Sequence, residues 1–280
     1  MASGTDCDLH IHTTESDGTD TPEEVVSRAV SLGLGAVAIT DHDTVKGISR
    51  AVRAAAGRLM VVPGVEISTQ DGDREVHILG YFIKSNNRAL LEKLYEMHLR
   101  RRERMRKIVR RLRETGVPIE QERVAAMAGS GVVGRPHIAR VLVEMGVVAT
   151  VEDAFRRFLG RGCPAYVPRA RFPAAGAVRL IREAGGVAVL AHPGLTHGEE
   201  IIDKLSASGL GGIEVEYPEH TAEQREFFHG LARRYGLIAT GGSDYHGTND
   251  RFPLGSAVVP YGVVRQLWAS SRQVRSGSER

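Results

Sequence analysis

The sequence contains little cysteine, few aromatic residues and no long hydrophobic run, and these shortages exclude several classes of protein. Two cysteines, Cys7 and Cys163, among 280 residues provide neither a disulfide framework nor a cysteine-rich metal site. No hydrophobic run reaches the length of a membrane-spanning helix, so we expect no membrane partner. The first residues lack the basic and apolar regions of a secretory signal. We therefore expect a cytoplasmic protein.

The charge of the chain is unevenly distributed. Residues 84–114 contain twelve Lys and Arg and four Glu, a local balance of +8. Since the whole chain carries +3, the remainder is mildly acidic. Nine of the basic residues fall within residues 100–113 and could contact nucleic-acid phosphates. Because no aromatic residues interleave for base stacking, we interpret this segment as a solvated helix face that helps to steer anionic substrates.

Short β-branched runs alternate with helical patterns along most of the chain. We expect strands at 7–11, 36–40, 60–65, 76–82, 187–191, 212–216, 237–240 and 257–259, and helices at 22–32, 45–56, 174–184, 199–208 and 222–235. Thr21 followed by Pro22 fits an N-cap and a first helical turn. Alternation at this spacing predicts an α/β fold with mostly parallel strands.

The middle of the chain has a different pattern. Hydrophobic residues at helical spacing predict a long amphipathic helix from 87 to 116, and helical patterns continue to 158. We therefore predict an α/β body formed by residues 1–85 and 166–270, either a barrel or an open sheet, a helical insertion at 86–165 that caps the site, and a frayed tail at 271–280. We predict no stable protein partner.

Side chains that ligate metals recur near the ends of six predicted strands. They are His10, His12, Asp17, His42, Glu66, His77, His192, Asp244 and His246. In parallel α/β folds these strand ends meet at one face. His77 lies nearer the start of its strand, and a structural role is the alternative for it. Asp41 is at least as plausible in support of a metal ligand as it is as a ligand itself. Asp43 is at least as plausible as a helix N-cap.

The chemical types of these residues indicate the kind of metal. Mixed imidazole and carboxylate ligands suit Zn, Mn or Fe better than Mg or Ca. Nine candidates exceed the needs of one ion, so we expect two or three divalent transition-metal ions, with Mn²⁺ first and Zn or Fe as alternatives. A carboxylate such as Glu66 can bridge two ions.

Six motifs in order resemble the PHP (polymerase and histidinol phosphatase) superfamily: His-x-His with Asp17, "TDHD", "PGVEIS", "HILGY", "AHP" and "SDYH". The resemblance implies a distorted seven-stranded (β/α) barrel with two or three metals at its C-terminal face. It implies a first ion on His10, His12, Glu66 and Asp244, a second on Glu66, His77 and His192, and a third on Asp17, His42 and His246. Glu66, Asp244 and His246 are the residues to which we give catalytic roles.

The insertion and its "VVGRPHIAR" stretch resemble the branch that hydrolyses nucleoside 3′,5′-bisphosphates, some members of which trim short RNA from the 5′ end. We therefore expect removal of the 3′-phosphate of a nucleotide by a metal-bridging hydroxide, because coordination lowers the pKa of water to about 7 in favourable cases. Short RNA is a further expected substrate class. In "GRPH", Arg135 and His137 lie at an expected helix start, where an anion can bind. The alternative for Arg135 is an exposed residue without a substrate contact.

Three other functions remain open from the sequence. One is hydrolysis of histidinol phosphate or another small phosphomonoester with the same metals. Another is metal-dependent cleavage of C–N bonds on a barrel that also begins with His-x-His. That group usually bridges its metals with a modified lysine, whereas Glu66 occupies the comparable strand end here. The last is a non-catalytic nucleic-acid-binding accessory module, which the retention of a full ligand set disfavours.

Overall fold

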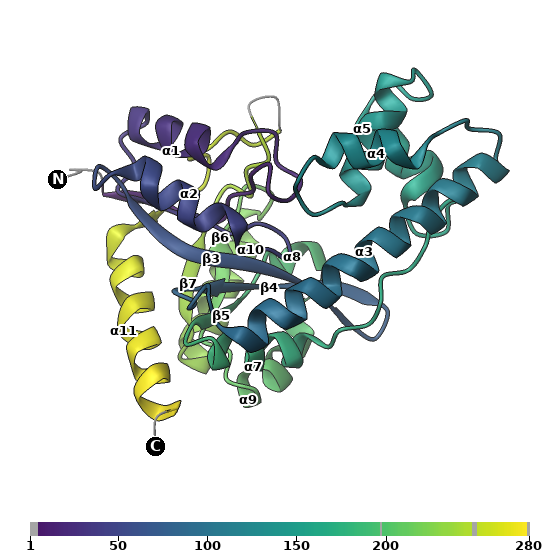
Figure 1. The fold of residues 1–280 in the computed structure, drawn as a ribbon. Coiled ribbons are helices and arrows are strands. Elements are labelled where there is room, and N and C mark those ends of the chain that lie inside the picture. The colour runs from purple at the N-terminus through teal and green to yellow at the C-terminus, as the bar shows by residue number, and fades with distance from the viewer. Residues whose placement is uncertain (1–4, 197, 248–250, 279–280) are drawn as a thin grey trace. The chain divides into compact units, whose positions relative to one another are not determined.

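A computed structural model of the protein describes residues 5–196, 198–247 and 251–278 (Figure 1). The chain forms two compact units. The barrel unit comprises residues 1–92 and 171–280, and the insertion unit comprises residues 93–170. Helix α3 (Arg88–Glu114) begins in the barrel unit and continues into the insertion unit.

Eight strands form one sheet in the barrel unit, in the order β7-β6-β5-β4-β3-β2-β1-β8. They are β1 (Asp6–Asp8), β2 (Ala36–Ile39), β3 (Met60–Asp71), β4 (Arg74–Tyr81), β5 (Val187–Leu190), β6 (Gly212–Glu216), β7 (Ile238–Gly241) and β8 (Val259–Pro260). Strands β1, β2 and β3 are parallel, as are β5, β6 and β7. Strand β4 is antiparallel to both β3 and β5, and β8 is antiparallel to β1.

The segment that follows β1 joins the segment that follows β7 and nearly closes the sheet. The backbone N–H of Leu9 donates to the carbonyl of Gly241 at 3.2 Å, and that of His12 donates to Tyr245 at 2.9 Å. This seam requires glycine at position 242, because a Cβ there would lie 2.3 Å from the backbone nitrogen of His10. The predicted α/β barrel is confirmed, with β8 as an eighth strand at its edge.

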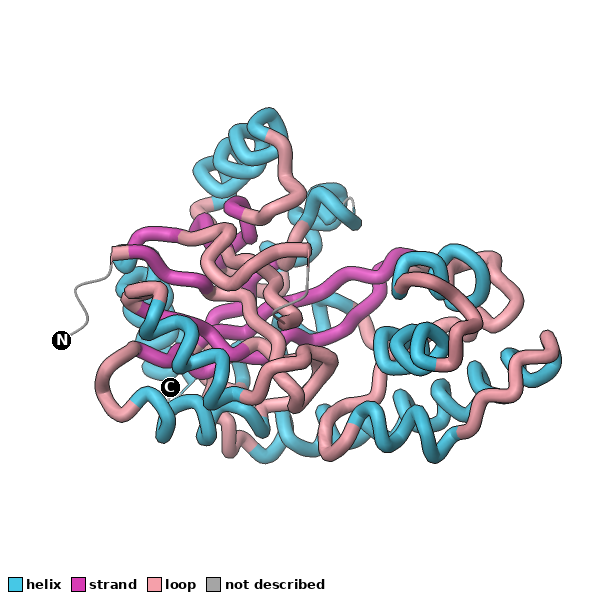
Figure 2. Tube along the Cα trace, turned by 90° about the horizontal axis from the view of Figure 1, so that it is seen from above, coloured by secondary structure: helices cyan, strands magenta, loops and turns pink. Residues whose placement is uncertain are grey.

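Both faces of the sheet are buried. In β2, Ala36 and Ala38 pack in one hydrophobic cluster, while Val37 and Ile39 pack in another with α1 and α2. This alternation follows from the two-residue period of a strand. Figure 2 shows the strands of this unit flanked by helices. The helices of the unit, beyond the start of α3, are α1 (Pro22–Ser31), α2 (Lys46–Ala55), α7 (Ala174–Glu183), α8 (Pro193–Thr196), the 3₁₀ turn η2 (Gly198–Ile201), α9 (Ile202–Ala207), α10 (Ala222–Tyr235) and α11 (Tyr261–Ser278).

The start of α1 agrees with the sequence prediction, whereas the C-terminal segment does not. Thr21 caps α1 in a capping box with Glu24, and Pro22 is its first residue, as predicted. The tail predicted to fray at 271–280 is instead helical to Ser278, within α11. It is held because Ser271 is fully buried and the guanidinium of Arg275 donates to the carbonyls of Gly185 and Phe82.

The insertion unit has a hydrophobic core of its own. Its helices after α3 are α4 (Gln121–Ala128), α5 (Arg135–Glu144), α6 (Val151–Ala154) and the π-helical turn η1 (Phe155–Leu159). Ile108 and Leu112 of α3 pack with Ile138 and Leu142 of α5, each at most 1% exposed. An independent core explains why this segment forms a compact unit.

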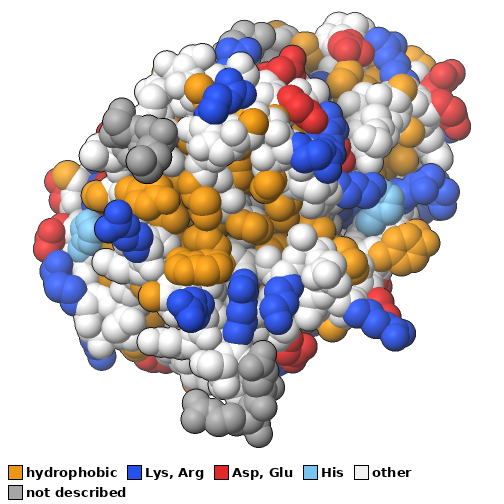
Figure 3. Space-filling view, turned by 60° about the vertical axis from the view of Figure 1, so that its left-hand side comes forward, with side chains coloured by type: hydrophobic (Ala, Val, Ile, Leu, Met, Phe, Trp, Pro, Cys, Tyr) orange, Lys and Arg blue, Asp and Glu red, His pale blue; other side chains and the backbone are white. Residues whose placement is uncertain are grey.

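The surface is not uniformly polar. Figure 3 shows hydrophobic side chains gathered on one face. Trp268 and Leu32 are among the large hydrophobic residues that are exposed in the barrel unit. Among the described helices, none is both long and apolar enough to span a membrane.

Candidate metal centre

Two histidines that follow β1 meet two carboxylates from other parts of the sheet. Nε2 of His12 lies 3.2 Å from Oε2 of Glu66 and 3.1 Å from Oδ1 of Asp244. Nε2 of His10 lies 3.4 Å and 3.3 Å from the same two oxygens. Both histidine side chains are fully buried. The alternation of His10 and His12 thus directs both rings toward the same pair of carboxylates.

The other oxygen of Glu66 faces a second pair of histidines. Oε1 lies 2.9 Å from Nδ1 of His77 and 3.1 Å from Nε2 of His192. Nδ1 of His42 lies 2.9 Å from Oε2. We predicted a strand at 60–65 with Glu66 at its end. Instead, β3 continues to Asp71 in a hairpin with β4. Glu66 lies in mid-strand with its carboxylate between the two groups of rings.

The antiparallel direction of β4 explains the position of His77. This histidine lies in the first half of β4, which begins at Arg74, and it pairs with Ser68 of β3. Because β4 runs opposite to its neighbours, its start lies at the same end of the sheet as the C-terminal ends of the parallel strands. The structure therefore brings His77 to the same site as the other eight predicted ligands.

A third group surrounds Asp17. Its Oδ1 lies 3.5 Å from Nε2 of His246 and 3.8 Å from Nδ1 of His12. Ligand atoms of His12, Asp17, His42 and His246 all lie within 4.8 Å of one another. The same holds for His10, His12, Glu66 and Asp244, and for His42, Glu66 and His77. His42 thus adjoins two groups, whereas the family resemblance implies only one for it.

Two of these residues have unusual backbone conformations. His192 and Asp244 have φ angles of 26° and 53°, in the left-handed region that non-glycine residues rarely adopt. Each follows a strand end, β5 and β7 respectively. Such strain persists where the surroundings impose it, and it is common at functional sites.

The donor set suits divalent cations. Among the described residues, Nε2 of His10 and His12 and Nδ1 of His42 and His77 are buried without a hydrogen bond. Each nevertheless lies within 3.4 Å of a carboxylate oxygen. Nitrogen lone pairs and carboxylates directed at a shared space form a typical transition-metal site. The cluster therefore supports divalent-metal binding.

Burial and charge act in opposite directions on these groups. Burial favours neutral His12, but Asp244 and Glu66 outweigh it and raise the pKa of His12 to about 10. For His77, burial prevails over the attraction of Glu66 and lowers the pKa to about 4. Burial opposes ionisation of Glu66, yet the surrounding histidines hold its pKa well below the usual value. The carboxylate of Glu66 is thus ionised.

Glu214 and Tyr217 support this site, and we did not predict either. Oε1 of Glu214 lies 3.0 Å from Nδ1 of His10, and its Oε2 accepts from the backbone N–H of His192 at 2.7 Å. The carboxylate favours a proton on Nδ1, which leaves the Nε2 lone pair for a ligand role. Tyr217 donates to Oδ2 of Asp244 at 3.1 Å. The sequence signal that could have identified Glu214 is a charged residue in the middle of the predicted strand "GIEVE", where a buried charge needs a partner.

Other residues near the ligands have structural roles. Asp41 accepts from the backbone N–H and hydroxyl of Thr13 and from the hydroxyl of Ser16, which holds the loop before Asp17. An N-cap role for Asp43 is wrong, because α2 begins at Lys46 and Asp43 accepts from the backbone N–H of Ser68.

His220 is a buried histidine outside the ligand set. It is 3% exposed and precedes α10. Its Nδ1 lies 2.9 Å from the carbonyl of Val215, and its Nε2 accepts from the backbone N–H of Gly194. It therefore ties the loop after His192 to β6.

The predicted phosphate-binding residues lie at the start of α5 in the insertion unit. Arg135 is the first residue of this helix, with its guanidinium carbon 5.5 Å from the centre of the Phe155 ring. His137 is 2% exposed, and its Nδ1 accepts from the backbone N–H of Gly134 at 3.0 Å. One ring nitrogen of His137 therefore caps the helix.

Comparison with known proteins identifies the family. The model of the PHP domain matches residues 8–127. The 5′-3′ exoribonuclease Rnm of Escherichia coli is 37% identical, with 93% of each chain covered. The chain belongs to the PHP domain family. It is an enzyme, a metal-dependent phosphoesterase.

Relatives within the family differ in their named substrates. The 3′,5′-nucleoside bisphosphate phosphatase of Chromobacterium violaceum is 37% identical, over 85% of this chain and 86% of that protein. A phosphoribosyl 1,2-cyclic phosphate 1,2-diphosphodiesterase of Eggerthella lenta is 36% identical, over 90% and 98%. A crystal structure from Bifidobacterium adolescentis, of a protein assigned as a metal-dependent phosphoesterase, superposes with a TM-score of 0.89 at 34% identity, covering 94% and 95%. The sequence identities of these relatives to the chain are too similar to indicate which of the named substrates it shares.

Proposed function

We propose that the protein is a phosphatase that removes the 3′-phosphate of nucleoside 3′,5′-bisphosphates and yields nucleoside 5′-monophosphates. Short RNA, attacked from its 5′ end, is the second substrate class of the proposal. The observation that supports a metal-dependent reaction is the position of Glu66. Its two carboxylate oxygens face different groups of histidines. That arrangement suits a carboxylate shared by two ions.

We assign His10, His12, Glu66 and Asp244 to a first ion, Glu66, His77 and His192 to a second, and Asp17, His42 and His246 to a third. Mn²⁺ is the ion we expect, with Zn or Fe as alternatives. When bound, such ions activate water and neutralise phosphate oxygens. Glu214 orients His10, and Tyr217 orients Asp244, so that their other ligand atoms remain directed at the centre.

Selection of the substrate is assigned to the insertion unit. Arg135 begins α5, where a guanidinium and the positive end of a ten-residue helix adjoin. Both favour a phosphate that does not react. Nδ1 of His137 accepts a hydrogen bond that caps this helix, so this nitrogen is engaged within the protein. We therefore assign the main role in substrate selection to Arg135.

Kinetics on a substrate panel test this proposal. The panel contains adenosine 3′,5′-bisphosphate, adenosine 3′-monophosphate, histidinol phosphate, a ribose 1,2-cyclic phosphate and a 5′-phosphorylated oligoribonucleotide. We expect the highest kcat/KM for the bisphosphate, with release of phosphate and adenosine 5′-monophosphate. A higher kcat/KM for histidinol phosphate or the cyclic phosphate would reject the proposed substrate.

A further inference from the structure

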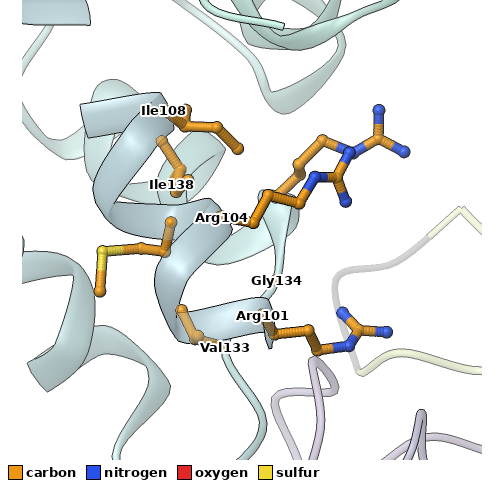
Figure 4. A pocket seen from close by; sticks show the side chains of 8 residues that line it. Arg101, Arg104, Ile108, Val133, Gly134 and Ile138 are labelled. Atoms are coloured by element: carbon orange, nitrogen blue, oxygen red, sulfur yellow. The ribbon is translucent and has the colours of Figure 1, made fainter. Parts of the chain in front are cut away.

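The basic residues of α3 divide into two sets. Arg101 and Arg104 are only 8% and 9% exposed. Figure 4 shows their side chains extending from α3 in the same direction, and they line a pocket together with Val133 and Gly134. Our interpretation of residues 100–113 as a solvated face therefore does not hold for these two arginines. The other basic residues of this segment are exposed to solvent.

Glutamates of the same helix neutralise some of the exposed basic residues, but not all of them. The ion pairs join Arg100 to Glu96, Lys107 to Glu103, and Arg110 to Glu114. Among the described residues, no ion pair involves Arg102 or Arg106. These two arginines are four residues apart, so they are neighbours on the helix surface. Two exposed guanidinium groups next to each other thus keep their full charge available for a ligand.

Two exposed hydrophobic side chains lie on the same side of α3, nearer its start. Tyr95 is 64% exposed and Leu99 is 47% exposed. At about 100° per residue, Tyr95, Leu99, Arg102 and Arg106 fall within an arc of about 60° around the helix axis. All four belong to the insertion unit. We call these four residues the outer face of α3.

Tyr95 is the aromatic residue that the basic segment itself lacks. Residues 100–113 contain no aromatic residue, and Tyr95 precedes them by one and a half turns of helix. Only the helical conformation brings its ring onto the same face as Arg102 and Arg106. Among the described residues, no hydrogen bond or ring contact engages the Tyr95 side chain. Its ring is therefore available to stack with a ligand.

The chemistry of the outer face indicates the class of ligand. Arginine side chains bind backbone phosphates, and an exposed aromatic ring stacks with a base. Tyr95 and Arg106 lie about 16 Å apart along the helix axis, which exceeds the spacing of successive phosphates in one strand. Bases in a duplex already stack on one another, whereas bases in a single strand are free to stack on a side chain. The outer face therefore matches single-stranded RNA better than duplex RNA.

We propose that the outer face of α3 binds single-stranded RNA, with phosphates on Arg102 and Arg106 and a base stacked on Tyr95. The inference rests on the proposed function, in which short RNA is the second substrate class. It adds a surface that holds nucleotides of the RNA other than the one that reacts. Because a longer strand reaches more of this surface, the affinity for RNA should increase with its length.

Fluorescence anisotropy of the metal-free full-length protein with a 5′-phosphorylated oligoribonucleotide of about ten nucleotides tests the surface. Tyr95→Ala should weaken binding about five- to a hundredfold, as for the loss of one stacked base, and should not alter its salt dependence. The double variant Arg102→Gln and Arg106→Gln should also weaken binding. It should reduce the slope of log affinity against log salt concentration by about 1.4, because each phosphate contact of a single strand contributes about 0.7.

Other exposed residues of the insertion unit supply matched controls. Arg123 and Arg156 are paired with Glu144 and Asp153, so Arg123→Gln with Arg156→Gln removes the same formal charge away from the outer face. This double variant should change the affinity by less than about twofold. Tyr95→Phe keeps the ring and should bind RNA as the wild type does. Circular dichroism must show that each variant is folded.

The inference and the proposed function fail in different ways. Unchanged affinity in Tyr95→Ala or in the Arg102 and Arg106 double variant, or an equal loss in the Arg123 and Arg156 control, would overturn the RNA surface while hydrolysis of a bisphosphate by the wild type stands. Absence of RNA binding by the wild type would also overturn it and leave the outer face to a protein partner. Conversely, RNA binding that depends on the outer face, in a metal-loaded protein that hydrolyses no phosphate ester, would reject the function and keep the surface.

Discussion

Oε1 of Glu214 lies 3.0 Å from Nδ1 of His10, and both side chains are fully buried. A proton on Nδ1 orients the ring so that Nε2 faces Glu66 and Asp244 and is the nitrogen left to ligate an ion. Glu214→Gln weakens this orientation while almost preserving shape, so metal affinity should fall about ten- to a hundredfold. Titration with Mn²⁺ measures it. Glu216→Gln, two residues along the same strand and with a side chain that is 34% exposed, is the control, and equal effects of the two substitutions would remove this role from Glu214.

Glu66 provides the second prediction. Glu66→Gln replaces a charged oxygen by an amide between two groups of histidines, which should release at least one ion and reduce turnover. Elemental analysis of the purified variant gives the number of ions per chain. If the variant retained the stoichiometry and rate of the wild type, Glu66 would not be a shared ligand.

Metal binding should release protons. In the metal-free protein, Asp244 and Glu66 raise the pKa of His12 to about 10, so His12 is protonated at pH 7.5. A ligating histidine must be neutral, and the incoming ion therefore displaces this proton. Apparent affinity should rise as the pH increases from 6 toward the pKa of His12. Calorimetric titrations in two buffers of different ionisation enthalpy detect the release, and identical heats in both would contradict protonation of this site.

Arg135→Ala should discriminate between substrates. It should reduce kcat/KM for a 3′,5′-bisphosphate about ten- to a hundredfold, which corresponds to a charge-assisted contact of about 1.5–3 kcal/mol. A 3′-monophosphate lacks the second phosphate and should lose much less. Arg123→Ala, on α4 of the same unit and half exposed, controls for the loss of charge. Equal losses on both substrates would mean that Arg135 is not the selector.

Most of the nine predicted ligands follow strand ends that share one end of the sheet, such as His192 after β5 and Asp244 after β7, and strand periodicity can be recognised from local sequence. His77 shows the limit of that reasoning. The sequence places it near the start of a strand, away from the C-terminal strand ends, and only the reversed direction of β4 explains why it lies with the other ligands. Strand direction depends on pairing between segments far apart in the chain, as with β4 and β5, which no local pattern encodes.

Contacts between distant segments account for the other differences. Glu214 meets His10 across 204 residues of sequence, and Arg275 of the supposed tail bonds to Phe82. The hydrogen bond from Gly194 to the buried His220 likewise joins segments that are 26 residues apart. The basic residues of α3 are evident from the sequence. That Arg101 and Arg104 are buried while others on the helix are exposed depends on tertiary packing and is known only from the structure.

Metal removal and restoration is the most direct test of the account. Protein treated with a chelator and verified as metal-free by elemental analysis should not hydrolyse adenosine 3′,5′-bisphosphate, because the clustered histidines and carboxylates alone provide no activated nucleophile. Addition of Mn²⁺ should restore hydrolysis, with half-maximal activity at the concentration at which the site fills. Full activity in the verified metal-free protein would contradict the central claim that this cluster is a catalytic metal centre.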